Sequence, residues 1–268
     1  MFRVDVKGLS VAYERVGEGP ALVLLHGFSI DSRMWRPQIE ALKGQFTVFA
    51  WDAPGAGRSS DPPDPYGLAD WADCLAACLS SVGLERAHIA GLSWGGILAQ
   101  EFYRRHSPFV ESLILAGTYA GWEGSLPQPI PQERLAACLR DASLPPEDFV
   151  AKYLPSMFSR SPNPQAFEEL AGIMRGFHPS GFRLMAMASA VDTRNILPTI
   201  TVPTLLLWGE SDERSPIAVA HALLKEIAGS RLALIPKAGH VSNLENPEAF
   251  SKEIRNFCLT TPRSSLSS

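Results

Sequence analysis

The sequence predicts an α/β protein in which a mostly parallel central sheet is flanked by helices and interrupted by an inserted helical cap. Three observations support this fold class: short apolar runs alternate with helix-like stretches, the runs are apolar almost throughout, and closely spaced prolines break the alternation once. Parallel strands need a crossover connection, so such alternation is typical of a parallel sheet. The 268 residues, 46% of them hydrophobic, are enough for one substantial core.

The chain begins with two strand-like segments, 2–7 and 9–16, which predict an antiparallel pair. After a Gly-Glu-Gly-Pro turn comes the run Leu22–Leu25, which has no polar residue, so helices should cover this strand on both faces. The alternation then predicts strands at 21–25, 46–51, 87–91 and 111–116 and helices at 33–43, 68–82 and 95–106.

Between Gly121 and about Asn195 this rhythm gives way to short helical pieces rich in Met and Phe and divided by prolines. It returns afterwards with strands at 204–208 and 231–235 and helices at 216–228 and 247–258, so the stretch interrupts one sheet. The predicted domains are a core made of 1–120 and 196–260, a helical cap of 121–195 and a flexible polar tail of 261–268.

The segment Gly91–Gly96 reads Gly-Leu-Ser-Trp-Gly-Gly and lies between a strand-like and a helix-like stretch. This is the context of a nucleophile elbow, in which glycines let strand and helix pack closely around a strained turn that projects a serine, here Ser93. The helix end at such a turn favours developing negative charge. The alternative is a glycine-rich turn with an incidental serine, which three further segments oppose.

The first of these is a His-Gly-Phe segment that ends a predicted strand and places Phe28 where a second oxyanion donor is expected. The backbone N–H groups of Phe28 and Trp94 are therefore predicted to form an oxyanion hole. Asp212 and His240 each stand on a loop at the carboxyl end of a strand, where ligands of open parallel sheets gather. The predicted catalytic residues are Ser93 as nucleophile, Asp212 as acid and His240 as base, in the expected chain order.

From about Val11 to Leu259 the chain resembles the α/β-hydrolase superfamily. The resemblance is strongest to the 3-oxoadipate enol-lactonase, non-haem haloperoxidase and small carboxylesterase group, in the stretches 34–38, 51–60 and 91–96. It implies hydrolysis of a carboxylic ester or lactone without a metal. Haloalkane dehalogenases and epoxide hydrolases carry an aspartate where this chain has Ser93, which disfavours those activities. Ala56 stands where the group usually has a histidine, which can alter the contacts of that turn.

Three other polar residues compete for roles in the site. Asp52 lies on a turn rich in Gly and Pro, where a carboxylate commonly accepts local backbone hydrogen bonds, so a structural role is favoured. For His26 the resemblance implies that it braces the oxyanion loop. Glu123 could replace Asp212 as the acid, but the loop before it has no carboxylate at the expected position.

Aromatic residues of the elbow and the cap are the predicted substrate contacts: Trp94, Trp122, Phe158 and Phe177. An apolar lining favours a hydrophobic or ring-bearing substrate, because enzyme pockets are mostly apolar with few polar groups. The alternative is that the cap aromatics only pack the cap onto the core.

No cofactor or metal site is expected, because the histidines outside the triad lack carboxylate or thiol neighbours at metal-ligand spacing. The four cysteines, Cys74 and Cys78 among them, are expected to be reduced buried thiols. A net charge of −4 without a basic patch argues against nucleic acid as a partner. The lack of a signal-peptide pattern and of an apolar stretch near the ~20 residues of a membrane span favours a cytoplasmic protein that does not enter membranes. The sequence leaves the oligomeric state open.

Other functions fit the same residues. A carbon-carbon bond hydrolase of a vinylogous diketone uses the same triad, and perhydrolysis follows when peroxide meets the acyl-enzyme. A ligand receptor on the same fold is the alternative from a different class, since fold alone does not fix function.

Overall fold

Residues 1–160 and 162–261 are described by a computed structural model. Within them the strands form one eight-stranded sheet in the order β1-β2-β4-β3-β5-β6-β7-β8. The strands are β1 (Phe2–Val6), β2 (Leu9–Val16), β3 (Ala21–Leu25), β4 (Thr47–Trp51), β5 (Ala87–Leu92), β6 (Val110–Ala116), β7 (Thr204–Gly209) and β8 (Arg231–Ile235).

The pairing of the strands confirms the predicted mostly parallel sheet. β1 pairs with β2, and β2 with β4, in antiparallel registers, whereas every pair from β4 to β8 is parallel. Strands β3, β4, β5 and β7 are buried along nearly their whole length, which explains their unbroken apolar sequences. From β3 the chain continues to β4 on one side of β3, and it then crosses to β5 on the other side of β3. The carboxyl ends of β3 and β5 therefore meet at a change of direction where ligands usually bind.

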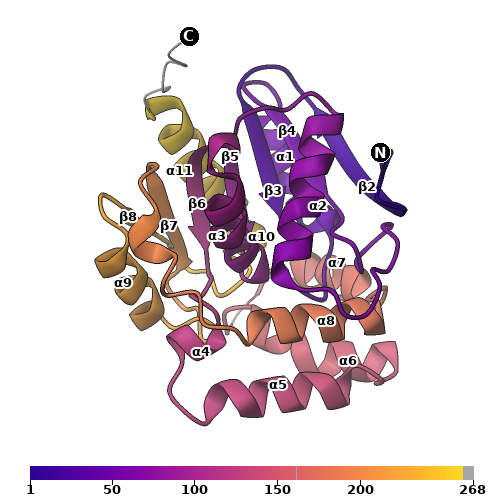
Figure 1. The fold of residues 1–268 in the computed structure, drawn as a ribbon. Coiled ribbons are helices and arrows are strands. Elements are labelled where there is room, and N and C mark those ends of the chain that lie inside the picture. Colours follow the sequence, from indigo (N-terminus) through magenta and orange to yellow (C-terminus); the bar gives the residue numbers. More distant parts are fainter. Residues whose placement is uncertain (161, 262–268) are drawn as a thin grey trace.

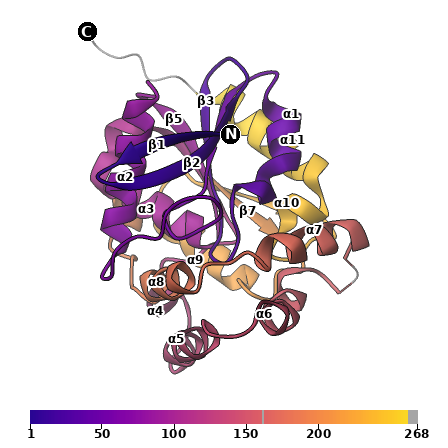
Figure 2. The same ribbon diagram turned by 90° about the vertical axis from the view of Figure 1, so that its right-hand side faces the viewer.

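Helices cover both faces of this sheet, as predicted. Figure 2 shows α2 and α3 on one side and α1, α10 and α11 on the other. The helices that flank the sheet are α1 (Arg36–Leu42), α2 (Leu68–Ser81), α3 (Trp94–His106), α9 (Ile217–Glu226), α10 (Ser242–Glu245) and α11 (Pro247–Thr260). The single turn α10 was not predicted, because four residues are too few to show a helical period.

Between β6 and β7 the described chain is helical, and these helices gather at one end of the sheet (Figure 1). They are α4 (Trp122–Ser125), α5 (Ile130–Asp141), α6 (Pro146–Tyr153), α7 (Pro164–Met174) and α8 (Pro179–Ser189), and we call them the cap helices. Short 3-10 helices lie at Ser32–Trp35, Ser107–Phe109, Pro155–Met157 and Leu197–Thr199. The division of the chain into a core and a cap domain stays a prediction.

The cysteines lie in the protein interior. All four cysteines are buried and free of disulfides, as expected.

At the end of α11, the Thr261 hydroxyl donates to the Phe257 carbonyl, so the chain is still bonded to the helix there. The rest of the predicted tail, 262–268, lies outside the described residues. Within the described residues, none of the helices has the length and apolar character needed to cross a membrane.

The cap helix α8 meets the core at a contact between two glycine backbones. A Cβ at Gly181 would overlap the carbonyl oxygen of Gly55, and one at Gly55 would lie 2.7 Å from the Gly181 Cα. Beside this contact, His178 Nε2 lies 3.1 Å from the Gly57 carbonyl and the Ser180 hydroxyl donates to Asp61. The turn after β4 therefore packs directly against the start of α8. At Gly55 and Gly181 this contact leaves no space for a side chain.

This contact predicts opposite outcomes for two glycine-to-alanine changes in the cap helices. Gly181→Ala should lower the free energy of unfolding by about 1–3 kcal/mol, because the added methyl group forces two backbones apart. Gly172→Ala in α7, where a Cβ would meet nothing within 4 Å, should raise it by up to about 1 kcal/mol. Urea unfolding of both variants measures this, and equal stability of the two would contradict the contact.

Candidate active site

Ser93 lies at a strained turn between β5 and α3. Its φ of 57° and ψ of −116° are unusual for a residue with a side chain, and strain of this kind persists only where surrounding packing imposes it. The packing is visible at two glycines: a Cβ at Gly91 would overlap the Gly95 carbonyl, and one at Gly95 would overlap the Leu25 carbonyl. Glycine is thus required on both sides of Ser93, as the elbow motif predicts.

Thr118 joins this turn to the loop after β7. Its hydroxyl donates to the Ser93 carbonyl at 2.6 Å, and its own carbonyl accepts from the Ser215 hydroxyl at 2.9 Å. A Cβ at Gly96 would lie 2.5 Å from the Thr118 hydroxyl, so a third glycine makes room for this link. The positions of the turn and of the Asp212 loop are therefore linked through one residue, Thr118.

The predicted acid and base form a buried pair. His240 Nδ1 lies 2.9 Å from Asp212 Oδ2, and the two residues are 4% and 7% exposed. The other carboxylate oxygen, Oδ1, accepts from the backbone N–H groups of Arg214 at 2.9 Å and Ser215 at 2.8 Å. With both oxygens held, the carboxylate is fixed in orientation, and a proton on Nδ1 leaves His240 Nε2 as the acceptor.

The pair lies against the end of β6, close to Ser93. The Ser93 N–H donates to the Ala116 carbonyl at 2.9 Å. At the next residue, a Cβ on Gly117 would lie 3.2 Å from Asp212 Oδ2 and 3.3 Å from His240 Nδ1. Glu123, the alternative acid, is exposed on α4. Asp212 is thus the carboxylate that contacts His240.

The predicted oxyanion donors are both available. Among the described residues, neither the Phe28 N–H nor the Trp94 N–H donates a hydrogen bond within the protein. Trp94 is the first residue of α3, so its N–H also carries the partial positive charge of a helix N-terminus. An N–H group without a protein acceptor is one requirement of an oxyanion donor, and the oxyanion hole itself stays a prediction.

His26 and Asp52 brace the surrounding loops, as predicted. His26 Nδ1 lies 2.7 Å from the Gly27 carbonyl, and Nε2 accepts from the Ala53 N–H at 3.0 Å. Complete burial lowers the pKa of His26, so the ring is neutral with its proton on Nδ1. Asp52 accepts from the backbone N–H groups of Ser32 and Arg58, both at 2.9 Å.

The predicted substrate contacts lie in aromatic clusters around the site. Trp122 packs edge-on against the Phe28 ring at 6.0 Å, whereas Phe177 stacks on Phe149 at 3.9 Å. The Trp94 ring lies 5.2 Å from Trp71 and 6.1 Å from His26, in the core beneath the loops. The role of these residues in substrate binding stays a prediction.

The ring of Phe158, the remaining predicted contact, is tilted against that of Phe167, with the centroids 5.3 Å apart, and its backbone packs on Gly239 next to His240. Its backbone therefore lies beside the loop that carries the predicted base. Its substrate role also stays a prediction.

Sequence reasoning missed two arginines beside the Asp212 loop. Arg134 donates to the Tyr119 hydroxyl at 3.0 Å and to the Arg214 carbonyl at 3.2 Å, and the Arg214 guanidinium donates to the Ser156 hydroxyl at 2.7 Å. Burial lowers the pKa of Arg214, and the positive charge of Arg134 lowers it further. Neither arginine has a sequence pattern that marks it, because cap and loop meet only in three dimensions.

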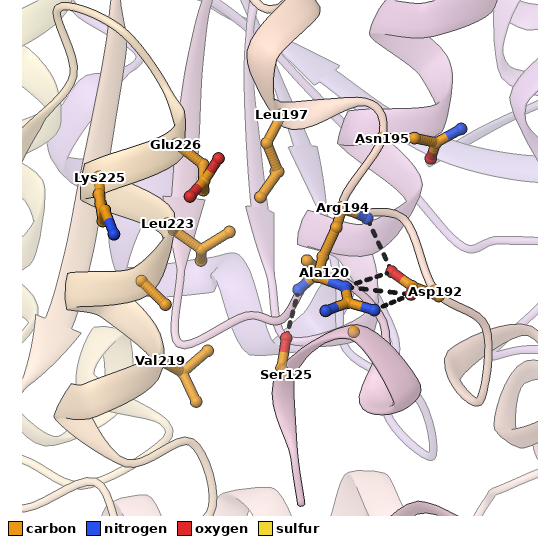
Figure 3. Close-up of a pocket in the computed structure, with 12 residues that line it drawn as sticks. Ala120, Ser125, Asp192, Arg194, Asn195, Leu197, Val219, Leu223, Lys225 and Glu226 are labelled. Carbon is orange, nitrogen blue, oxygen red and sulfur yellow. Dashed lines mark hydrogen bonds and ion pairs between the residues drawn. The ribbon is translucent and has the colours of Figure 1, made fainter.

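A cavity of about 800 Å³ opens away from these residues. It lies between α4, α9 and the segment 192–197, and Figure 3 shows Arg194 paired with Asp192 on its wall. The Ser93, Asp212 and His240 side chains do not line it. The residues that line it include Ser125, Asp192 and Glu226 but no histidine to serve as a base, so the candidate site is the cluster around Ser93. Within the described residues, no group of three or more His, Cys, Asp or Glu side chains is arranged to hold a metal ion.

Comparison with known proteins identifies the family of the chain. Residues 22–253 match the family described as "Alpha/beta hydrolase family". The chain is 28% identical to a pimeloyl-acyl-carrier-protein methyl ester esterase of Vibrio vulnificus, over 91% of this chain and 96% of the relative. Its structure is similar to a thermophilic esterase from Thermogutta terrifontis, with a TM-score of 0.89, 28% identity and coverage of 97% and 99% of the two chains. It is also similar to an enol-lactonase from Burkholderia xenovorans, with a TM-score of 0.88, 26% identity and coverage of 96% and 99%.

The neutral, buried state of His26 predicts a pH dependence of stability. Below its ordinary pKa of 6.5 the unfolded chain takes up a proton that the folded chain does not, so this residue's contribution to stability is complete above pH 6.5 and falls with the pH below it. The slope from this one group reaches about 1.4 kcal/mol per pH unit. Urea unfolding between pH 7.5 and pH 5 should therefore show a shallower slope for His26→Gln than for the wild type, whereas identical slopes would contradict the buried neutral ring.

Proposed function

Because the chain belongs to the α/β-hydrolase family, we propose that it is a metal-independent serine hydrolase that cleaves a carboxylic ester or lactone through an acyl-enzyme. The observation that carries the proposal is the buried His240–Asp212 pair with both carboxylate oxygens hydrogen-bonded, next to the strained turn at Ser93. Esterases and an enol-lactonase among the similar proteins support the ester or lactone bond as the target.

In the first step His240 Nε2 takes the proton of the Ser93 hydroxyl as its oxygen attacks the carbonyl carbon. The imidazolium that forms is stabilised by Asp212, whose charge is buried with it at 2.9 Å. The same proton then passes to the leaving alkoxide, which departs as the alcohol, or as the opened end of a lactone. Water, deprotonated by His240, releases the acid and regenerates Ser93.

The negative charge that develops on the carbonyl oxygen is received by the N–H groups of Phe28 and Trp94. These donors need no reorganisation during the reaction, because no other acceptor within the described protein holds them. His26 and Asp52 contribute indirectly, since their hydrogen bonds hold the loops on which Phe28 and its neighbours stand.

The apolar rings near Phe28 fit an uncharged acyl or ring-bearing group better than a charged one at that end of the site. The Phe28 ring stacks on the Phe182 ring with their centroids 5.2 Å apart, and the Trp122 ring packs edge-on against Phe28. Ser93 is only 6% exposed, so the nucleophile lies below the protein surface, among these side chains.

The test is hydrolysis of p-nitrophenyl esters of rising acyl length together with a panel of lactones. Ser93→Ala and His240→Ala should each reduce kcat by about 10⁴-fold to 10⁶-fold, and Asp212→Asn somewhat less, since these groups act as a unit. The dependence of activity on acyl length measures how long a chain the site accepts.

The control for this series is Ser80→Ala on the surface of α2, which should behave as the wild type. Wild-type activity in Ser93→Ala would reject the serine mechanism. A folded wild type that cleaves an aryl diketone faster than every ester and lactone would reject ester hydrolysis and favour a carbon-carbon bond hydrolase with the same triad.

A further inference from the structure

The loop that carries His240 is held on both sides by a single stretch of chain from the cap region. On one side, the Val241 N–H donates to the Met157 carbonyl at 3.0 Å. On the other side, a Cβ at Gly239 would lie 2.6 Å from both the Phe158 carbonyl carbon and the Ser159 nitrogen, so the two backbones are in direct contact. The residues before and after His240 are therefore both packed against 157–159.

Glu245 completes this arrangement from α10. Its Oε2 accepts from the Gly239 N–H at 2.6 Å, and its two oxygens accept from the Ser159 N–H at 3.1 and 3.0 Å. The Ser159 hydroxyl donates to Oε1 at 2.6 Å. One carboxylate thus joins the residue before His240 to Ser159, with charge-assisted hydrogen bonds that are shorter and stronger than neutral ones.

We propose that Glu245 is a positioning residue for His240, which it holds in catalytic register by tying Gly239 to Ser159 of the cap region. This inference rests on the proposed function, in which His240 is the base. Asp212 fixes the rotation of the imidazole through Nδ1, and Glu245 fixes the backbone from which the ring extends.

The geometry explains why a second carboxylate is useful there. His240 stands on an irregular loop between β8 and the single turn of α10, so regular secondary structure does not hold its backbone. A shift of about 1 Å in a general base can cost on the order of 100-fold in rate, because proton transfer needs hydrogen-bond distance. Four hydrogen bonds that the Glu245 carboxylate accepts limit that shift.

The arrangement also links the cap to the chemistry. The Ser159 and Met157 contacts exist only while 157–159 lies against the His240 loop. Movement of this stretch releases Glu245 and Val241 together, so the base is fully positioned only when the stretch is in place.

The experiment compares kcat and KM for Glu245→Ala, Glu245→Gln and Ser159→Ala with the best p-nitrophenyl ester. In Glu245→Ala, kcat should fall by about 10-fold to 100-fold while KM stays within about 3-fold. The reason is that the change displaces the base His240 but not the aromatic residues proposed to contact the substrate. The rate at which an aryl phosphonate labels Ser93 should fall by the same factor, because that reaction needs the same base.

Glu245→Gln is the conservative rescue. A glutamine oxygen can accept from the Gly239 and Ser159 N–H groups while its NH₂ donates to the Ser159 hydroxyl, so kcat should stay within about 3-fold of the wild type. Ser159→Ala removes one hydrogen bond and should lower kcat by roughly 2-fold to 10-fold. The matched control is Asn163→Ala, which removes a helix cap from α7 in the same region and should lower Tm without changing kcat.

Several results would overturn the proposal. Unchanged kcat in a folded Glu245→Ala, a loss confined to KM, or equal losses in the Gln and Ala variants would each show that Glu245 does not position the base through these hydrogen bonds. If Glu245→Ala fails to fold, Ser159→Ala decides: reduced kcat at unchanged Tm supports the proposal, and unchanged kcat rejects it. Failure of the proposed function is distinguishable, because Ser93→Ala would then keep wild-type activity.

Discussion

The close backbone approach at the turn between β5 and α3 is the constraint on which the rest of the site depends. Gly91 and Gly95 leave no space for a side chain, and Gly95 brings the start of α3 against the carbonyl of Leu25 at the end of β3. This contact places the Trp94 N–H beside the loop that carries Phe28. A strained residue, a helix N-terminus and a second strand end are thus brought together by two short backbone contacts.

The acid and the base are then brought to this turn from the other half of the chain. β6 lies between β5 and β7, and its carboxyl end supplies Gly117 against the acid-base pair and Thr118 as the link to both loops. Since β7 and β8 come after the cap helices in sequence, the site forms only when both halves of the sheet have paired. The site therefore depends on strands from both sides of the cap helices in the sequence.

The sequence predicted much of this arrangement, because strands, helices and the glycine motif are local patterns. Apolar runs located the parallel strands, and loops at strand ends located Asp212 and His240, which the structure brings together. Contacts that depend on how the cap region meets the core were not predicted. Glu245 and Ser159 lie 86 residues apart, and Arg134 and Arg214 lie 80 apart, so no periodicity links them. The sequence identified Trp94 and the cap aromatics as apolar residues. Which neighbours their rings contact depends on tertiary packing, which the sequence pattern does not show.

The most direct test of the serine mechanism is the covalent intermediate itself. Rapid mixing of the protein with a p-nitrophenyl ester, followed by acid quenching and mass spectrometry of its peptides, reports which side chain carries the acyl group. The account predicts a burst of p-nitrophenol close to one equivalent per chain and an acylated peptide modified at Ser93, with both signals absent in Ser93→Ala. An acyl group on another residue, or a burst that survives in Ser93→Ala, would contradict it.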